Sequence, residues 1–352
     1  MEMRLPHLRR RPTSADVAAR AGVSRTTVSF VLNGRADVQI PSTTWRRVEE
    51  AARELGYHPH EAARQLAGGS SLILGVVLRQ SADQVAADAL LSATLWGLAQ
   101  AARQGGYRVL IEPLAPGSGT YADLLRSQRA DGLVVSGPRA DDDELAGLVR
   151  DGFPIVLQGS RPDLDAPSVD VDNQAGARVA VEHLIGLGHR RVACITNAPL
   201  AYTAASQRLA GYRQALEAAN LEPDERLIVE GSFDAASGYT AMGQLLRRAN
   251  PTAVFVASDV VAFGAMRALR EAGRRVPLDI SIVGFDDIPM AEHFDPPLTT
   301  VRLPAHALGA AAGQALMDRV AGRRVAPRTL LPTELIVRNS TTTVGSRQAG
   351  GP

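Results

Sequence analysis

The chain has 352 residues, of which 45% are hydrophobic and 21% are charged. This composition is close to the globular average, so it excludes wholesale disorder, and the length allows about two or three domains. The 38 basic residues nearly cancel the 37 acidic ones, and the formal net charge of +1 argues against a uniformly polybasic coat protein. All 38 basic residues are arginine, which excludes Schiff-base chemistry and phosphate-binding loops that depend on lysine.

The net charge is divided unevenly along the chain. Residues 1–70 contain 11 arginines and 7 acidic residues, a net charge of +4. Residues 71–352 contain 27 arginines and 30 acidic residues, a net charge of −3. The composition changes at the flexible stretch Gly68-Gly69-Ser70-Ser71. A small basic N-terminal part and a larger, slightly acidic part are therefore predicted.

Features of secreted and membrane proteins are missing from the sequence. A single cysteine, Cys194, excludes an intramolecular disulfide framework and suits a reducing compartment. Residues 1–12 form an Arg-rich arm without the apolar stretch of a signal peptide, and no run of 18 apolar residues predicts a membrane span. We therefore expect a cytoplasmic protein without a membrane partner.

Motifs of catalysis and metal binding are also missing. The sequence contains no Gly-x-Ser-x-Gly elbow, no phosphate loop, no paired cysteines and no His-Glu-x-x-His. We expect a protein that is not an enzyme and that has no cofactor and no metal site.

The basic part has the pattern of a helix-turn-helix. Apolar residues recur at helical spacing over residues 17–21 and 28–32. Gly22 can end the first helix with a sharp turn, and Ser24 is positioned to cap the second. A third helix is expected at Ser42–Leu55. Two short helices backed by a third predict a DNA-binding domain, with an ordinary small helical bundle as the alternative.

Beyond the glycine junction, short apolar runs alternate with amphipathic stretches. The predicted strands are Leu72–Leu78, Arg108–Glu112, Gly132–Val135, Pro154–Leu157, Arg191–Ile195, Thr252–Ala257 and Ser281–Gly284. The helices predicted between them include Ala89–Gly105, Gln174–Leu187, Ser206–Asn220, Ser237–Arg248 and Val260–Ala272. This alternation is typical of βαβ units around parallel sheets. Because seven strands exceed what one such domain usually holds, we expect two α/β domains with a ligand cleft at the carboxyl ends of their strands.

Several motifs in the basic part carry a resemblance to a known family. The stretch Val17-Ala18-Ala19-Arg20-Ala21-Gly22-Val23-Ser24, followed by Thr27-Val28-Ser29 and Asn33, resembles the headpiece of the LacI/GalR family of bacterial repressors. Leu55-Gly56-Tyr57-His58-Pro59 and Ala63-Arg64-Gln65-Leu66 are similar to the end of that family's third helix and to its hinge helix.

The likeness continues through the α/β part and covers about residues 13–340. Asp172-Asn173, Gly188-His189-Arg190-Arg191, Ser258-Asp259 and Gly284-Phe285-Asp286-Asp287 are similar to the family's core, which itself resembles periplasmic sugar-binding proteins. The resemblance implies an all-α headpiece and hinge helix followed by two Rossmann-like subdomains with parallel sheets.

Domain bounds follow from the resemblance. The expected parts are an arm at 1–12, a helix-turn-helix domain at 13–58, a hinge helix and linker at 59–71, a first core subdomain at 72–170 and 304–331, a second at 171–303 and 332–344, and a disordered tail at 345–352.

The resemblance also implies roles in DNA binding. Arg25 and Thr26 would open the recognition helix and face base edges in the major groove. The positions that usually hold phosphates are Ser24, Thr27, Ser29, Asn33 and Tyr57. In the hinge, Ala63 would contact DNA and Leu66 matches a leucine that wedges between base pairs in the minor groove. The hinge helix, roughly residues 60–67, has only eight residues, which is too few for a stable isolated helix. We therefore expect it to fold only when it packs against another surface.

A ligand site is implied in the core. The residues expected to line the cleft are Gln158, Arg208, Phe233, Asp259 and Asp286. An arginine fork can donate to adjacent oxygens, a carboxylate can accept from neighbouring hydroxyls, and Phe233 can stack on a ring. This chemistry suits a carbohydrate, with an interdomain ion pair of Arg208 and Asp286 as the alternative reading of those two residues.

We therefore expect a homodimeric repressor that binds pseudo-palindromic operator DNA and responds allosterically to a small molecule, with a sugar or sugar derivative as the expected effector. Two other functions are weighed against it. A transport binding protein is opposed by the missing signal peptide and by the headpiece, and an enzyme on the same scaffold is opposed by the missing catalytic motifs.

Overall fold

The computed structural model describes residues 12–32, 38–57, 70–114, 120–127 and 129–344. The chain divides into two compact units, Met1–Ser71 and Leu72–Pro352. None of the helices in the described ranges combines the length and the apolar content that a bilayer crossing requires. Several predictions fall outside these ranges: most of the N-terminal arm, Asn33, the hinge helix with Ala63 and Leu66, and the tail from residue 345.

The first unit contains three helices, α1 (Ser14–Ala21), α2 (Arg25–Leu32) and α3 (Ser42–Leu55). A reciprocal capping box begins α1, because Thr13 and Asp16 each bond the other's backbone N–H. Gly22 ends α1 with a φ of 65°, a left-handed conformation that glycine adopts without strain. This tight turn leads directly into the next helix, so the predicted helix-turn-helix is confirmed.

A small apolar core holds the three helices together. Its buried members come from one face of each helix: Val17, Ala18, Ala21, Val28, Val31, Val48, Ala51 and Ala52. Trp45 and Tyr57 pack against this cluster from its edge. Because the apolar residues of α2 point inward, its other face is left at the surface.

The second unit contains two six-stranded sheets. The first has the order β11-β5-β4-β3-β1-β2, with β1 (Ile73–Leu78), β2 (Arg108–Pro113), β3 (Gly132–Ser136), β4 (Ile155–Gln158), β5 (Ser168–Val171) and β11 (Arg328–Leu331). The second has the order β12-β10-β9-β8-β6-β7, with β6 (Val192–Ile195), β7 (Ile228–Val229), β8 (Ala253–Val256), β9 (Ser281–Asp286), β10 (Thr299–Arg302) and β12 (Glu334–Ile336). All pairs are parallel except β10 with β12.

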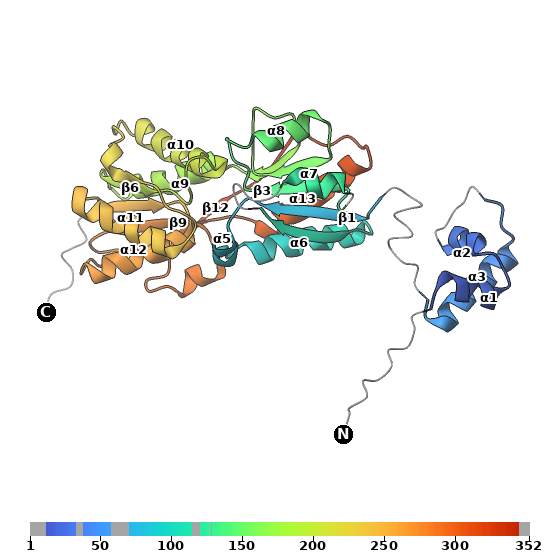
Figure 1. Cartoon of the computed structure of the whole chain (residues 1–352). Helices are drawn as coiled ribbons and strands as arrows, with labels where there is room; N and C mark the ends of the chain where they lie inside the picture. Colours follow the sequence, from blue (N-terminus) through green and yellow to red (C-terminus); the bar gives the residue numbers. More distant parts are fainter. Residues whose placement is uncertain (1–11, 33–37, 58–69, 115–119, 128, 345–352) are drawn as a thin grey trace, which may run out of the picture. The chain divides into compact units, whose positions relative to one another are not determined.

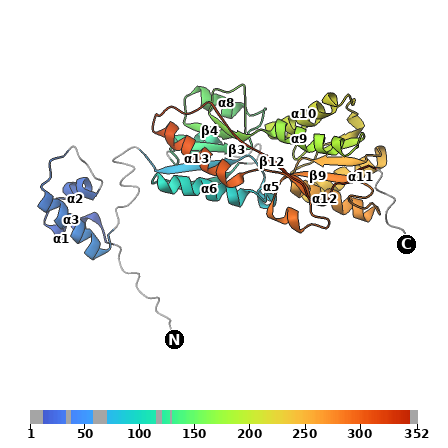
Figure 2. The ribbon, with the colours of Figure 1, turned by 180° about the vertical axis from the view of Figure 1, so that it is seen from behind.

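Helices cover both faces of each sheet (Figure 1; Figure 2, from behind). On the first sheet, α7 (Tyr121–Arg126) and α8 (Asp143–Arg150) pack on one face, and α6 (Leu91–Gln104) and α13 (Ala305–Val320) on the other. On the second sheet, α9 (Asn173–Gly186) and α10 (Thr203–Ala218) lie opposite α11 (Ala235–Arg248) and α12 (Asp259–Glu271). We call each sheet with its helices the first and the second subdomain.

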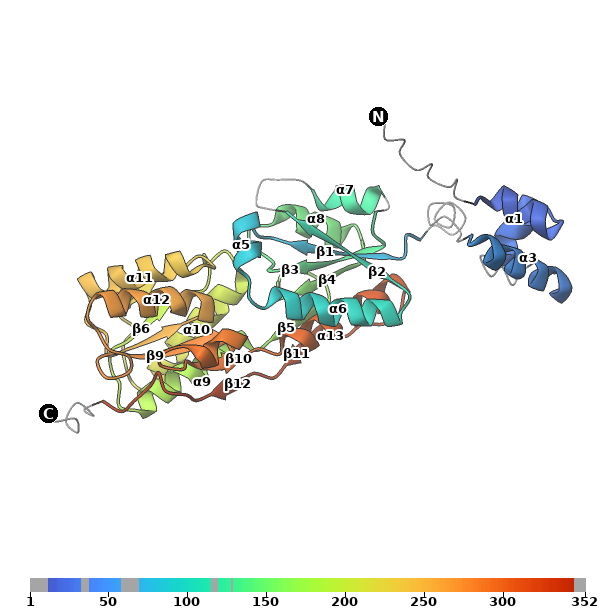
Figure 3. The same ribbon diagram turned by 90° about the horizontal axis from the view of Figure 1, so that it is seen from below.

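The chain passes between the two subdomains three times. It leaves the first sheet after β5, returns from β10 to α13, and leaves again between β11 and β12 (Figure 3). Since all three crossings connect the same two subdomains, a change in their relative orientation must be taken up by these short segments.

The predicted parallel α/β architecture is confirmed, and each strand and helix predicted beyond the glycine junction has a counterpart. Several elements were missing from the prediction, among them β5, β10, β11, β12 and α13. The edge strand β11 alternates exposed and half-buried residues, and β12 has only 3 residues, so neither forms a continuous apolar run. Helix α13 is rich in alanine and glycine and lacks a clear polar face.

Close helix packing in the first subdomain depends on glycine. A Cβ at Gly309 of α13 would overlap the carbonyl oxygen of Thr94 in α6, whereas a Cβ at Gly147 of α8 would meet only open space. We expect Gly309→Ala to lower the free energy of unfolding by about 2–3 kcal/mol, because the two backbones must separate. Gly147→Ala, its matched control, should be neutral or raise stability by up to about 1 kcal/mol. Urea denaturation measures both, and equal effects would contradict the packing explanation.

Candidate functional site

Helix α2 presents polar side chains at the surface of the headpiece. The Ser24 hydroxyl accepts the backbone N–H of Thr27 at 3.0 Å, so the predicted cap is present. Arg25, Thr26 and Ser29 are exposed, whereas Thr27 is half-buried. Arg25 at the start of the helix makes no hydrogen bond or ion pair within the described residues. An exposed face that begins with a free guanidinium is suited to reading a groove of duplex DNA.

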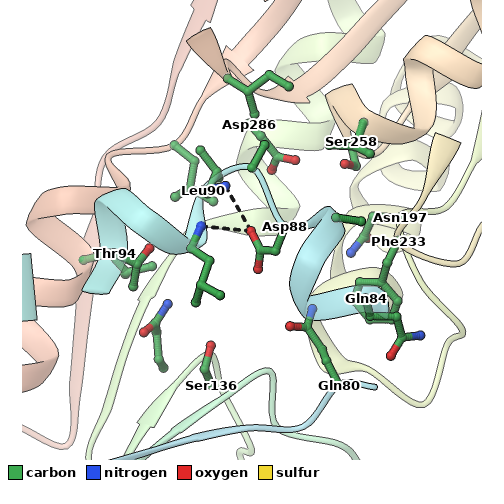
Figure 4. A pocket seen from close by; sticks show the side chains of 18 of the residues that line it. Gln80, Gln84, Asp88, Leu90, Thr94, Ser136, Asn197, Phe233, Ser258 and Asp286 are labelled. Atoms are coloured by element: carbon green, nitrogen blue, oxygen red, sulfur yellow. Dashed lines mark hydrogen bonds between the residues drawn. The ribbon is translucent and has the colours of Figure 1, made fainter. Parts of the chain in front are cut away.

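A cavity of about 170 Å³ lies between the subdomains at the carboxyl ends of the strands. Its lining comes from both subdomains and includes Gln80, Gln84, Asp88, Thr94, Ser136 and Gln158 from the first, and Asn197, Arg208, Phe233, Ser258 and Asp286 from the second (Figure 4). Leucine and isoleucine side chains complete the wall. This position in an α/β protein is where ligands bind by default.

Arg208 of α10 is fixed by four contacts. Its Nε donates to Asn173 Oδ1 at 2.9 Å, and its Nη1 donates to the carbonyl oxygen of Ala257 at 2.6 Å and to Asp286 Oδ1 at 3.3 Å. The guanidinium lies 3.8 Å from the centre of the Phe285 ring. Because only 6% of this side chain is exposed, the arginine is preorganised rather than free to reorient.

Asp286 and Phe233 are held in left-handed backbone conformations. Their φ angles are 118° and 66°, and such strain in a residue other than glycine is typical of functional sites. Burial raises the pKa of Asp286 to about 6, despite the opposing effect of Arg208. The Phe233 ring packs edge-on against Tyr202 at 4.8 Å, so it enters the cavity in one orientation.

Four of the five predicted ligand residues line the cavity, and Asp259 does not. Asp259 is completely buried, where it accepts the Thr300 hydroxyl at 2.6 Å and the backbone N–H of Ile288 at 3.0 Å. These bonds tie α12 to the neighbouring loop and to β10, so the structure gives Asp259 a role in positioning the second subdomain.

Other residues of the cavity were missing from the prediction. Asp88 precedes α6 and its Oδ1 accepts the backbone N–H groups of Leu90 and Leu91 at 3.0 and 3.1 Å. In the sequence, an aspartate before an apolar helix reads as a helix cap and gives no sign of a ligand. Asn197 lies two residues after the end of β6. Because ligand sites lie at the carboxyl ends of parallel strands, this position could have indicated Asn197 from the sequence.

The two subdomains also contact each other beside the cavity. The Tyr202 hydroxyl donates to the carbonyl oxygen of Arg79 at 2.7 Å, and Gln207 Nε2 donates to the Ser160 hydroxyl at 2.6 Å. Gln207 also accepts from Asn173, which accepts from Arg208. A hydrogen-bonded chain therefore connects the cavity, the crossing after β5 and the contact between subdomains.

A buried carboxylate at this crossing predicts a pH dependence. Burial raises the pKa of Asp170 from 3.8 to about 6, and its Oδ2 has no hydrogen-bond partner within the described residues. The carboxyl group of Asp170 therefore binds its proton more tightly in the folded chain than in the unfolded chain. The free energy of unfolding falls as the pH rises from about 4 to 6, and it is level above pH 6. Lowering the pH from 7 to 5 should raise the free energy of unfolding by about 1 kcal/mol through this group.

Asp170→Asn keeps an acceptor for Val171 and Asn173 and removes the titration. Urea unfolding at pH 5, 6 and 7 should show a smaller gain at low pH for this variant than for the wild type. An unchanged difference between pH 5 and pH 7 would show that Asp170 does not carry this proton.

Comparisons with known proteins agree with both parts of the chain. Residues 13–60 match the family described as bacterial regulatory proteins, lacI family, and residues 181–341 match the periplasmic binding protein-like domain. The HTH-type transcriptional regulator CelR of Thermobifida fusca is 38% identical over 94% of this chain and 99% of its own length.

Two solved structures are also similar. The lac repressor dimer bound to operator and the anti-inducer ONPF is 34% identical, with a TM-score of 0.82 over 94% of this chain and 99% of that one. The complex of CelR with cellobiose is 36% identical, with a TM-score of 0.71 over 94% and 100%. The predicted resemblance is confirmed: the chain belongs to the LacI family of DNA-binding transcriptional regulators.

Proposed function

We propose that this protein is a cytoplasmic repressor that binds a pseudo-palindromic operator as a homodimer and responds to a carbohydrate bound between its subdomains. The observation that carries the proposal is the presence of two binding surfaces in one chain. The headpiece presents the exposed face of α2, and the core encloses a cavity with a preorganised arginine, a carboxylate and a ring. The protein acts by binding rather than by catalysis.

The headpiece supports recognition of duplex DNA. Arg25 and Thr26 at the start of α2 would contact base edges, and the guanidinium fork of Arg25 matches the two acceptors of guanine. Ser24, Thr27, Ser29 and Tyr57 would set the register on the phosphates. The net charge of +4 over residues 1–70 favours approach to the polyanion.

The cavity supports a carbohydrate effector. An engineered cavity of about 150 Å³ binds one benzene ring, so a cavity of about 170 Å³ has room on the order of one ring. Phe233 would stack on the apolar face of that ring, while Arg208, Asp286 and Gln158 would bond its hydroxyls. The relative CelR has a solved complex with cellobiose, which supports this ligand class.

The three crossings between the subdomains would couple effector binding to operator binding. A ligand that contacts both subdomains favours one relative orientation of them, and the crossings transmit that preference along the chain. In a dimer, this orientation would set the spacing of the two hinge segments, so the affinities for effector and operator must change each other by the same factor.

The core surface supports a homodimer. Trp96 of α6 has 68% of its surface exposed, and Ile111 of the neighbouring edge strand β2 has 43% exposed. A second copy would cover these side chains in a two-fold arrangement. The related lac repressor, which is described as a dimer, is similar along 94% of this chain.

Selection from random duplexes with the purified full-length protein tests the proposal. We expect a two-fold symmetric consensus, bound by two chains per duplex and much more tightly than a shuffled duplex at the same salt concentration. Salt must be matched because the non-specific part of the affinity depends steeply on it. Equal affinity for selected and shuffled duplexes would contradict the proposal.

A further inference from the structure

We infer that Asp88 is a ligand-binding carboxylate contributed by the first subdomain, and that the cavity selects a non-anionic, hydroxyl-rich ring over its phosphorylated counterparts. This inference rests on the proposed function, since it specifies the effector of the same cavity.

One oxygen of the Asp88 carboxylate accepts hydrogen bonds from the protein, and the other is available to accept from a ligand. Oδ1 accepts both backbone N–H groups at the start of α6, and Oδ2 has no partner within the described residues. Figure 4 shows this carboxylate among the labelled cavity residues, between the side chains of the two subdomains. Because both oxygens of an ionised carboxylate can only accept, Oδ2 requires a donor from whatever enters the cavity.

Two amides share this requirement. The side-chain oxygens of Gln158 and Asn197 are buried without a hydrogen-bond partner in the described part of the chain, and both residues line the cavity. An amide can rotate to present its N–H₂ group, but a carboxylate has no such alternative. Asp88 therefore sets the preference for a ligand that donates, and a ring carrying several hydroxyls provides donors in several directions.

The charge balance of the cavity disfavours an anion. Its charged side chains are Asp88, Asp286 and Arg208. Arg208 already donates to Asp286, to Asn173 and to the Ala257 carbonyl oxygen, so its positive charge is shared within the protein. Burial raises the pKa of Asp88, and burial together with the nearby charge of Asp88 raises the pKa of Asp286. A phosphate group would add a third acceptor-only anion to this space.

The position of Asp88 also connects ligand binding to the relative orientation of the subdomains. Asp88 belongs to the first subdomain and Asp286 to the second, so one ligand that donates to both spans the interface between them. Hydrogen bonds from such a ligand to both carboxylates partly offset their mutual repulsion and favour the relative orientation of the subdomains in which both bonds form.

Matched ligand pairs test the inference with the full-length protein in the absence of DNA. At pH 7.5 and constant ionic strength, thermal shift and calorimetry would compare glucose with glucose 6-phosphate and ribose with ribose 5-phosphate, with inorganic phosphate alone as the test for a bare anion site. We expect stabilisation only by uncharged sugars. Stabilisation of the wild type by inorganic phosphate, or tighter binding of a phosphorylated sugar than of its uncharged partner, would overturn the inference.

Substitutions separate ligand binding from helix capping. Asparagine caps helices about as well as aspartate, so Asp88→Asn preserves α6 while removing the charge. It should weaken binding of the uncharged sugar about tenfold or more, whereas Asp83→Asn on the exposed face of α5 (Ala82–Ala87) should leave binding unchanged. If Asp88→Asn binds like the wild type, Asp88 is only a cap.

A charge reversal gives an answer whatever the effector is. Asp88→Arg should bind inorganic phosphate at least about tenfold more tightly than the wild type, because the charge at this position changes from negative to positive. Equal phosphate binding would contradict the placement of Asp88 at the cavity. Operator binding does not enter these measurements, so a failure of the DNA-binding proposal would be seen separately.

Discussion

Replacing Arg25 with alanine is expected to weaken binding to the selected operator about tenfold to hundredfold and to relax base preference at one position of each half-site. This loss corresponds to about 1–3 kcal/mol for a bidentate contact with guanine. The side chain begins α2, is exposed, and makes no ion pair within the described residues, so its removal leaves the headpiece core intact. Repeating the selection with the variant measures the change in preference.

A matched control removes the same charge from another helix of the headpiece. Arg20 of α1 pairs with Glu54 of α3 at 2.6 Å on the surface. Arg20→Ala should weaken the affinities for operator and shuffled duplex by a similar, small factor, because its charge contributes only to the general attraction for DNA. If Arg25→Ala also lowers both affinities equally, Arg25 contacts phosphate and not a base.

The fold was predictable where the sequence pattern is local. Buried parallel strands form continuous apolar runs, and the cap and turn at Ser24 and Gly22 depend on neighbouring residues only. The strands β11 and β12 were not predictable in this way, because they are short, lie at sheet edges and pair with partners distant in sequence. Their positions depend on tertiary contacts that no short window of sequence contains.

The residues that line the cavity were predictable only in part. Arg208, Phe233 and Asp286 are positions that the family resemblance places in the cleft, and all three line the cavity at the carboxyl ends of the strands. Asp88 lies about 200 residues from Asp286, and no spacing rule connects the two. Asp259 shows the opposite error: it belongs to a family motif, but its carboxylate is turned into the protein, where it bonds Thr300.

Removal of Arg208 is expected to have the largest effect on the core. Arg208→Ala should lower the free energy of unfolding by about 3–5 kcal/mol, because it leaves Asp286 buried beside an empty space without its ion-pair partner. It also removes the donor to Asn173 and to the carbonyl at the end of β8. Arg208→Lys keeps the charge but loses the planar fork, so it should recover only part of this stability.

A double-mutant cycle separates the ion pair from the other contacts. In Arg208→Ala/Asp286→Ala no unpaired charge remains, so the loss should be smaller than the sum of the two single losses by about 1–3 kcal/mol. Urea unfolding of the four proteins measures this coupling. Additive losses would show that Arg208 acts through Asn173 and the backbone instead of through Asp286.

The single substitution Arg208→Ala also tests whether the cavity controls DNA binding. Arg208 lies in the second unit of the chain and Arg25 in the first, so Arg208→Ala should still bind the operator at a temperature where its core is folded. It should no longer respond to a sugar that changes the operator affinity of the wild type, since the sugar has lost its fixed donor and the bonded path to the crossing after β5. Fluorescence anisotropy with labelled operator, with and without that sugar, measures the response. A variant that retained the full response would place the effector elsewhere in the protein.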